Sequence, residues 1–141
     1  MMSLRDRDRG SVTIWLALAS FAMIVLVGLA VDLSGQVYAQ QRAIDVAGQA
    51  ARAGGQQIDT GAMRGGTVQA DAAQAASAAR AYLASAGVEG TVTIAPGGAT
   101  IRVTTTTTYR TSFLSIIGIK TLQVSGQSDA DLVRAVNGTR R

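Results

Sequence analysis

The sequence predicts an α+β protein built on one long N-terminal helix that crosses a membrane and continues beyond it. Three observations support this fold class. Residues 12–31 form an uncharged apolar run, residues 68–86 repeat small apolar side chains at helical spacing, and the C-terminal part alternates β-branched and polar residues. The expected architecture is therefore the membrane helix with its extension, a second Ala-rich helix, and a three-stranded antiparallel β-meander.

The membrane segment is defined by its length and hydropathy. Residues 12–31 carry no charge, and their only polar side chains are the hydroxyls of Thr13 and Ser20. At about 1.5 Å per residue this segment covers about 30 Å, which is the thickness of the hydrocarbon layer of a bilayer. We therefore expect a single-pass membrane protein that has lipid as one of its partners.

The flanking charges predict the orientation of this segment. Arginines occupy positions 5, 7 and 9 on the short N-terminal side, whereas the next basic residue after the segment is Arg42. The positive-inside rule then leaves residues 1–11 in the cytoplasm. The expected location is the cytoplasmic (inner) membrane, with the C-terminal domain outside.

The apolar run admits a second interpretation, a signal peptide cleaved after Ala30, with Gly28 as the other small residue before the cut. The chain would then be a secreted or surface binding domain released by signal peptidase. However, the run exceeds the usual apolar core of about 7–15 residues. The helical pattern also continues after Val31, which predicts an extramembrane helix over residues 32–53 and favours the retained anchor.

A small α+β extracytoplasmic domain is expected over residues 68–141. The pair Gly54-Gly55 is predicted to end the first helix, and residues 54–67 are predicted to form a Gly-rich loop. Thr67 is the expected N-cap of the second helix and Gly87 its stop signal. Alanine dominates the apolar face of this helix, so we expect it to pack closely against a neighbour.

Three strands are predicted over residues 91–95, 100–110 and 120–128. Because side chains alternate between the two faces of a strand, one set is expected to point to the core. Its members are Val92, Ile94, Ile101, Val103, Tyr109, Leu122 and Val124.

The most apolar stretch outside the membrane segment is residues 113–119, between the second and third strands. One interpretation is a turn folded under the sheet to complete a thin core, since small domains have few apolar groups to bury. The other is an exposed docking patch for another subunit, formed by Phe113, Leu114, Ile116 and Ile117.

Composition argues against several function classes. The chain has no histidine and no cysteine, which removes the usual zinc and iron–sulfur ligands, the thiol nucleophile and the usual general base of a serine triad. We therefore expect a non-enzyme with no catalytic or metal site, no cofactor and no small-molecule substrate. Nucleic-acid binding is not expected either, because the basic residues are scattered and aromatic residues are few.

Four segments resemble the N-terminal region of TadE/TadG-like Flp pilus-assembly proteins. They are Arg9-Gly10-Ser11-Val12, Ala30-Val31-Asp32-Leu33-Ser34, Gln41-Arg42-Ala43-Ile44-Asp45-Val46-Ala47 and Ala50-Ala51-Arg52-Ala53-Gly54. The resemblance implies a membrane-anchored, minor pilin-like component of the tight-adherence pilus machine. Its implied partners are other Tad pilus-assembly membrane proteins, pilins and a secretion ATPase.

The resemblance also suggests a processing site between Gly10 and Ser11. Related pilin-like proteins are cut after a glycine and carry glutamate at the fifth mature position, where this chain has Trp15. Tryptophan cannot form the charge pair that such a glutamate makes with a neighbouring amino terminus. A retained anchor, nearer to the TadG side of the family, is therefore favoured over a filament subunit.

Polar residues beyond the membrane segment are candidates for contacts between helices. Asp32 directly follows the apolar run, where a carboxylate marks the exit of a helix from the membrane. Asp32 and Gln36 lie on one helical stripe, and Gln41 and Asp45 lie on the stripe beside it. These side chains could bond to a partner helix or simply face solvent.

Overall fold

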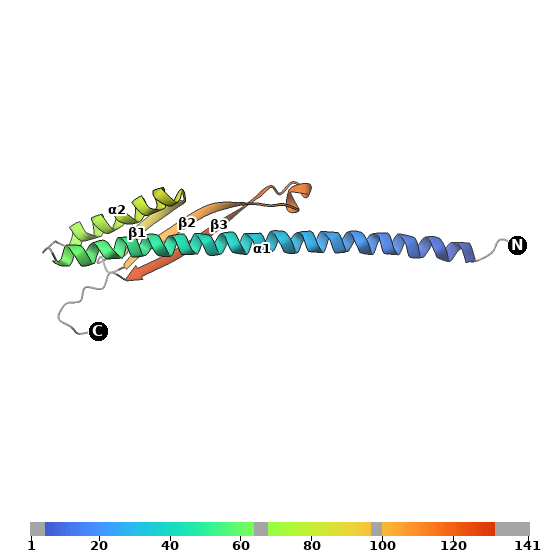
Figure 1. Cartoon of the computed structure of the whole chain (residues 1–141), viewed down its shortest axis with the longest axis horizontal. Coiled ribbons are helices and arrows are strands. Elements are labelled where there is room, and N and C mark those ends of the chain that lie inside the picture. Colours follow the sequence, from blue (N-terminus) through green and yellow to red (C-terminus); the bar gives the residue numbers. More distant parts are fainter. Residues whose placement is uncertain (1–4, 64–67, 97–99, 132–141) are drawn as a thin grey trace.

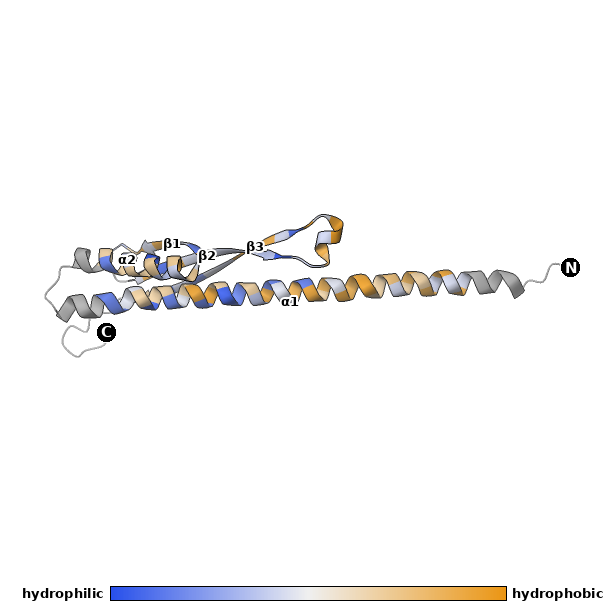
Figure 2. Ribbon diagram, turned by 45° about the horizontal axis from the view of Figure 1, so that its top comes forward, coloured by the Kyte–Doolittle hydropathy of each residue, from blue (hydrophilic) through white to orange (hydrophobic). Residues whose placement is uncertain are grey.

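One helix dominates the structure. The computed structural model describes residues 5–63, 68–96 and 100–131, and its helix α1 (Arg5–Met63) has 59 residues, or about 88 Å at 1.5 Å per residue. The other described elements lie along the C-terminal part of α1 (Figure 1). By contrast, every residue from 11 to 27 is exposed, and Figure 2 shows hydrophobic residues along this uncovered part.

Helix α2 (Val68–Ala86) returns beside the C-terminal end of α1 (Figure 1). It stops where the sequence predicts, because Gly87 has a positive φ of 65° that favours glycine. The Gly87 N–H donates to the Ala84 carbonyl and the Val88 N–H to the Leu83 carbonyl, a pattern that satisfies the last carbonyls of a helix. The predicted N-cap, Thr67, lies outside the described residues.

The sheet is the predicted antiparallel meander, in the order β1 (Glu89–Ile94), β2 (Thr100–Arg110) and β3 (Thr121–Asp131). The first strand begins earlier and the third ends later than the sequence predicts. Strand β1 pairs only with the first part of β2, from Ile94 opposite Ile101 to Glu89 opposite Thr106. Strands β2 and β3 therefore continue beyond β1 as a two-stranded hairpin that runs beside α1 (Figure 1).

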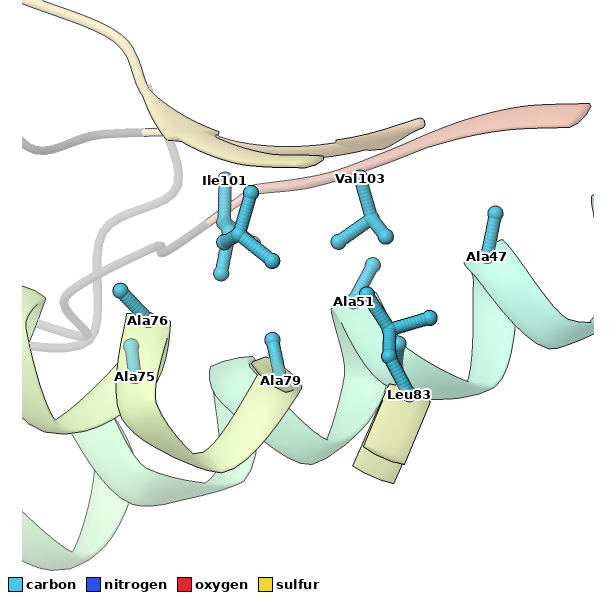
Figure 3. Close-up of a cluster of buried hydrophobic side chains, with 10 residues drawn as sticks. Ala47, Ala51, Ala75, Ala76, Ala79, Leu83, Ile101 and Val103 are labelled. Atoms are coloured by element: carbon cyan, nitrogen blue, oxygen red, sulfur yellow. The ribbon is translucent and has the colours of Figure 1, made fainter. Parts of the chain in front are cut away.

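The core lies where α1, α2 and the sheet meet. Its helix side chains are mostly alanines, whereas β2 supplies Ile101 and Val103, both fully buried (Figure 3). Arg102 between them is exposed, as strand alternation predicts. Because alanine is small, both helices approach the sheet closely, and the few larger side chains, including Leu83, fill the space between them.

The structure differs from the sequence-based prediction at Gly54-Gly55. Helix α1 passes through both glycines to Met63, so residues 54–63 are helical rather than part of a loop; residues 64–67 lie outside the described residues. Glycine is required at position 54 for packing, since a Cβ there would lie 2.8 Å from the Ile101 Cδ1 and 2.9 Å from the Ala75 carbonyl oxygen. Helix α1 thus forms one wall of the domain that the sequence places at residues 68–141.

Candidate functional site

The loop between β2 and β3 contacts α1 near the end of the apolar run. We call residues 111–120 the hairpin tip. It contains the single-turn helix η1 (Leu114–Ile117), which ends at Gly118 with φ 96°. Figure 1 shows the hairpin tip beside α1, far from α2 and β1.

Asp32 fastens the hairpin tip to α1. Its side chain is fully buried. One carboxylate oxygen, Oδ1, accepts a hydrogen bond from the Ser112 N–H at 2.6 Å; the other, Oδ2, accepts from the Phe113 N–H at 2.9 Å and the Leu114 N–H at 2.6 Å. Bonds to an ionised acceptor are stronger than bonds between neutral groups. The carboxylate therefore fixes the position of the hairpin tip along α1.

Two glycines of α1 let the hairpin approach on either side of Asp32. A Cβ at Gly28 would lie 2.6 Å from the Phe113 ring, and a Cβ at Gly35 would overlap the Tyr109 ring. Both aromatic rings thus lie directly against the helix backbone. Any larger side chain at these two positions would push the hairpin away from α1.

The same close contact continues along the sheet. The buried Thr105 hydroxyl donates to the Ala43 carbonyl at 2.8 Å, and Gly126 of β3 lies against the α1 backbone at Ala43. The lengths agree: from Ile101 to Tyr109 a strand rises about 26 Å, and from Gly54 to Gly35 a helix rises about 28 Å. Strand β2 therefore lies along α1 from Ile101 to Tyr109.

The hairpin tip presents an apolar surface. Ile116 is 80% exposed and Ile117 72%, Phe113 is 41% exposed, and Leu114 is half-buried. The interpretation that this stretch folds under the sheet to complete the core is wrong, because the hairpin extends beyond β1 and α2 and its isoleucines stay exposed, with contact to α1 only on the side of Phe113. Its role as a docking patch stays a prediction.

The polar residues predicted to contact a partner helix have different surroundings. For Asp32 the expected contact with a partner helix or with solvent is wrong, because its buried carboxylate bonds to the hairpin tip of the same chain. Gln36 is half-buried, whereas Gln41 and Asp45 are exposed and line a shallow groove of about 310 Å³ with Val37, Tyr38 and Arg42. Gly10 and Ser11 of the suggested processing site lie within α1.

Sequence reasoning missed the line of contact between α1 and the hairpin. The signal was a series of small residues on one side of α1, namely Gly28, Gly35, Ala43, Ala47 and Gly54. Such residues also occur on exposed helix faces, so the series became informative only when the opposing aromatic rings were located.

An ion pair on the outer face of the sheet was also missed. Arg102 and Asp129 are opposite each other in β2 and β3, and the guanidinium binds both carboxylate oxygens, at 2.9 and 2.8 Å. The hydrogen bond from Arg102 lowers the pKa of the Asp129 carboxyl. Because both side chains are exposed, the pair contributes little to stability.

Across the described part of the chain, no three acidic side chains lie close enough together to hold a metal ion. The contact between α1 and the hairpin tip is the most elaborate polar arrangement among these residues. It positions structural elements, because the carboxylate of Asp32 bonds to three backbone N–H groups of the hairpin tip.

These features define a class of protein, an α+β domain built along an N-terminal helix that is long and apolar enough to cross a membrane. Residues 10–57 match the Tad family model, described as Flp pilus-assembly TadE/G-like. This match confirms the resemblance and covers Gly28, Asp32, Gly35 and Gly54. It fits a component of pilus assembly. No significant match is found among curated proteins or among solved structures.

Proposed function

We propose that the chain is a membrane-anchored, non-catalytic, minor pilin-like component of a Flp/Tad-type pilus-assembly or secretion machine. The observation that carries this proposal is the uncovered apolar part of α1. Trp15 is 74% exposed and Leu16 68%, and every residue from 11 to 27 is exposed. An apolar surface of this extent needs cover, and its length suits a bilayer.

The proposal places residues 1–11 in the cytoplasm and the α+β domain outside, in keeping with the arginines that precede the span. Beyond the membrane α1 keeps one face open. Tyr38 is 82% exposed and Val37 57% on this face, beside Gln41 and Asp45. This mixed apolar and polar surface suits contacts with other Tad pilus-assembly proteins or pilins.

Membrane retention is the first test. A wash of isolated membranes at alkaline pH should leave the protein in the membrane fraction, and its intact mass should include residues 12–31. An intact mass that corresponds to a chain starting at Val31 would refute the anchor and favour a released binding domain. An intact mass that corresponds to a chain starting at Ser11 would instead indicate prepilin-type processing.

A charge inside the span provides a matched pair of variants. Val25→Arg should reduce the membrane-bound fraction sharply, because arginine near the bilayer centre costs about 2.5–3.5 kcal/mol on insertion scales. Ser85→Arg, on the exposed part of α2, should have no such effect. Equal membrane binding of both variants would contradict the assignment of the span.

The role in pilus assembly is tested in the native cell. Deletion of the gene should reduce the number of Flp-type pili, and the wild-type gene should restore it. A photocrosslinking residue at Tyr38 should capture another protein of the assembly, whereas one at Ser85 should not. Normal piliation after deletion would refute the proposed role even if the membrane anchor is present.

A further inference from the structure

The contact with α1 sets the depth of the hairpin tip relative to the membrane. The Phe113 ring lies against Gly28, and Gly28 belongs to the uncharged run that ends at Val31. Three residues of helix correspond to about 4.5 Å. If residues 12–31 span the bilayer, as the proposed function holds, Phe113 therefore lies at the outer boundary of the hydrocarbon.

The side chains at this depth are apolar. Ile116, Ile117 and Ile119 are 80%, 72% and 43% exposed. The chain carries no acidic residue between Glu89 and Asp129, so residues 90–128, which include the hairpin tip, carry no negative charge that would oppose contact with lipid. The nearest carboxylate along α1 is Asp32, which is buried.

Seven of the ten backbone N–H groups of the hairpin tip donate hydrogen bonds within the protein. Irregular backbone rarely enters hydrocarbon, because each unpaired N–H or carbonyl there is costly. Asp32 accepts from three N–H groups of the tip. The N–H groups of Thr111, Ile116, Gly118 and Ile119 donate to the carbonyls of Lys120, Phe113, Ser115 and Leu114, respectively.

Two cations lie at the base of the hairpin tip. Arg110 ends β2 and Lys120 precedes β3, and both are exposed. The hydrogen bond from the Thr111 N–H to the Lys120 carbonyl holds the two sides of the hairpin together there. With the isoleucines in the membrane, both cations would reach the level of the lipid phosphates, as basic residues beside inserted apolar segments do.

We propose that the hairpin tip inserts into the outer leaflet beside α1, so that lipid hydrocarbon covers Phe113, Ile116 and Ile117. The chain then contacts the membrane through two elements, the spanning helix and the shallow hairpin tip. The carboxylate of Asp32 connects these two elements. This attachment fixes the orientation of the domain over the membrane, because one helix alone leaves it free to rotate about the helix axis.

Depth measurements on the full chain test this proposal, and the absence of cysteine makes single labels straightforward. Ile117→Cys is labelled with a polarity-sensitive fluorophore, and the protein is reconstituted into vesicles of phosphatidylcholine and phosphatidylglycerol. We expect a blue-shifted emission that is quenched by lipids carrying a nitroxide high on the acyl chain and protected from aqueous iodide. A label at Ser85→Cys, on the exposed part of α2, should show the opposite behaviour.

A third label separates this inference from the proposed function. Ile24→Cys, within the span, should be quenched by nitroxides near the end of the acyl chain. A lipid-exposed Ile24 label together with an aqueous Ile117 label would overturn the inference and leave the anchor intact. An aqueous Ile24 label would remove the span and the inference with it.

Other occupants of the tip surface give distinct results. Protection of the Ile117 label that disappears when the protein is diluted with lipid would indicate a second copy of the chain. Protection in native membranes but not in vesicles would indicate a protein partner. Either result would overturn the assignment to lipid.

Discussion

The adjacent glycines of α1 offer a sharp test of how the domain packs. Gly54 is buried, and a Cβ there would lie 2.8 Å from the Ile101 Cδ1 and 2.9 Å from the Ala75 carbonyl oxygen, whereas a Cβ at Gly55 would meet nothing within 4 Å. The two residues are adjacent in the same helix, and only Gly54 has tertiary neighbours, Ile101 and Ala75, within reach of an added Cβ. Gly54→Ala and Gly55→Ala are therefore matched variants of one chemical change.

The magnitudes follow from two opposing effects. Alanine in place of a helical glycine stabilises by about 0.5–1 kcal/mol, and this gain is common to both variants. At Gly54 the added methyl group also overpacks the contact with α2 and β2, which costs about 1–3 kcal/mol. We expect Gly55→Ala to raise the free energy of unfolding above that of the wild type. The free energy of unfolding of Gly54→Ala should be lower than that of Gly55→Ala by the packing cost.

Thermal unfolding of the full chain in detergent micelles, followed by circular dichroism, measures the difference. Each kcal/mol moves the Tm of a domain of 60–100 residues by about 4–8 °C, so the two variants should be well separated. If α1 instead ended at this pair, the two alanines would have similar effects. Equal Tm values, or a more stable Gly54→Ala, would refute the close packing of α1 on α2.

Two further predictions concern the core and the contact at Asp32. Ile101→Ala should lower the free energy of unfolding by about 2–5 kcal/mol because Ile101 is fully buried, whereas Ile116→Ala should change it by less than about 0.5 kcal/mol because Ile116 is exposed; similar losses from denaturant titrations would contradict the assigned core. Asp32→Asn should speed hydrogen exchange at Ser112, Phe113 and Leu114, since an amide NH₂ would face N–H donors. Exchange rates that match those of Asp45→Asn, a change on the exposed face of α1, would show that the carboxylate does not hold the hairpin tip.

Local patterns predicted most of the secondary structure. The length of the apolar run, the β-branched residues of 100–110 and Gly87 each act through near neighbours, and the structure contains a long N-terminal helix, a strand over Thr100–Arg110 and a helix end at Gly87. Strand alternation likewise predicted the buried positions of Ile101 and Val103. These features follow from hydropathy and backbone preference, which need no knowledge of distant residues.

Tertiary structure decided what the ambiguous residues do. Glycine can end a helix or permit close packing, and only the position of Ala75 and Ile101 shows that Gly54 does the latter. A carboxylate after an apolar run can face headgroups, a partner helix or its own chain, and the partners of Asp32 lie 80 or more residues away in sequence. The sequence alone thus determined most of the helix and strand segments and the membrane-spanning length of the apolar run, whereas the continuation of α1 past Gly54 and the position of the hairpin tip depended on contacts between segments far apart in the chain.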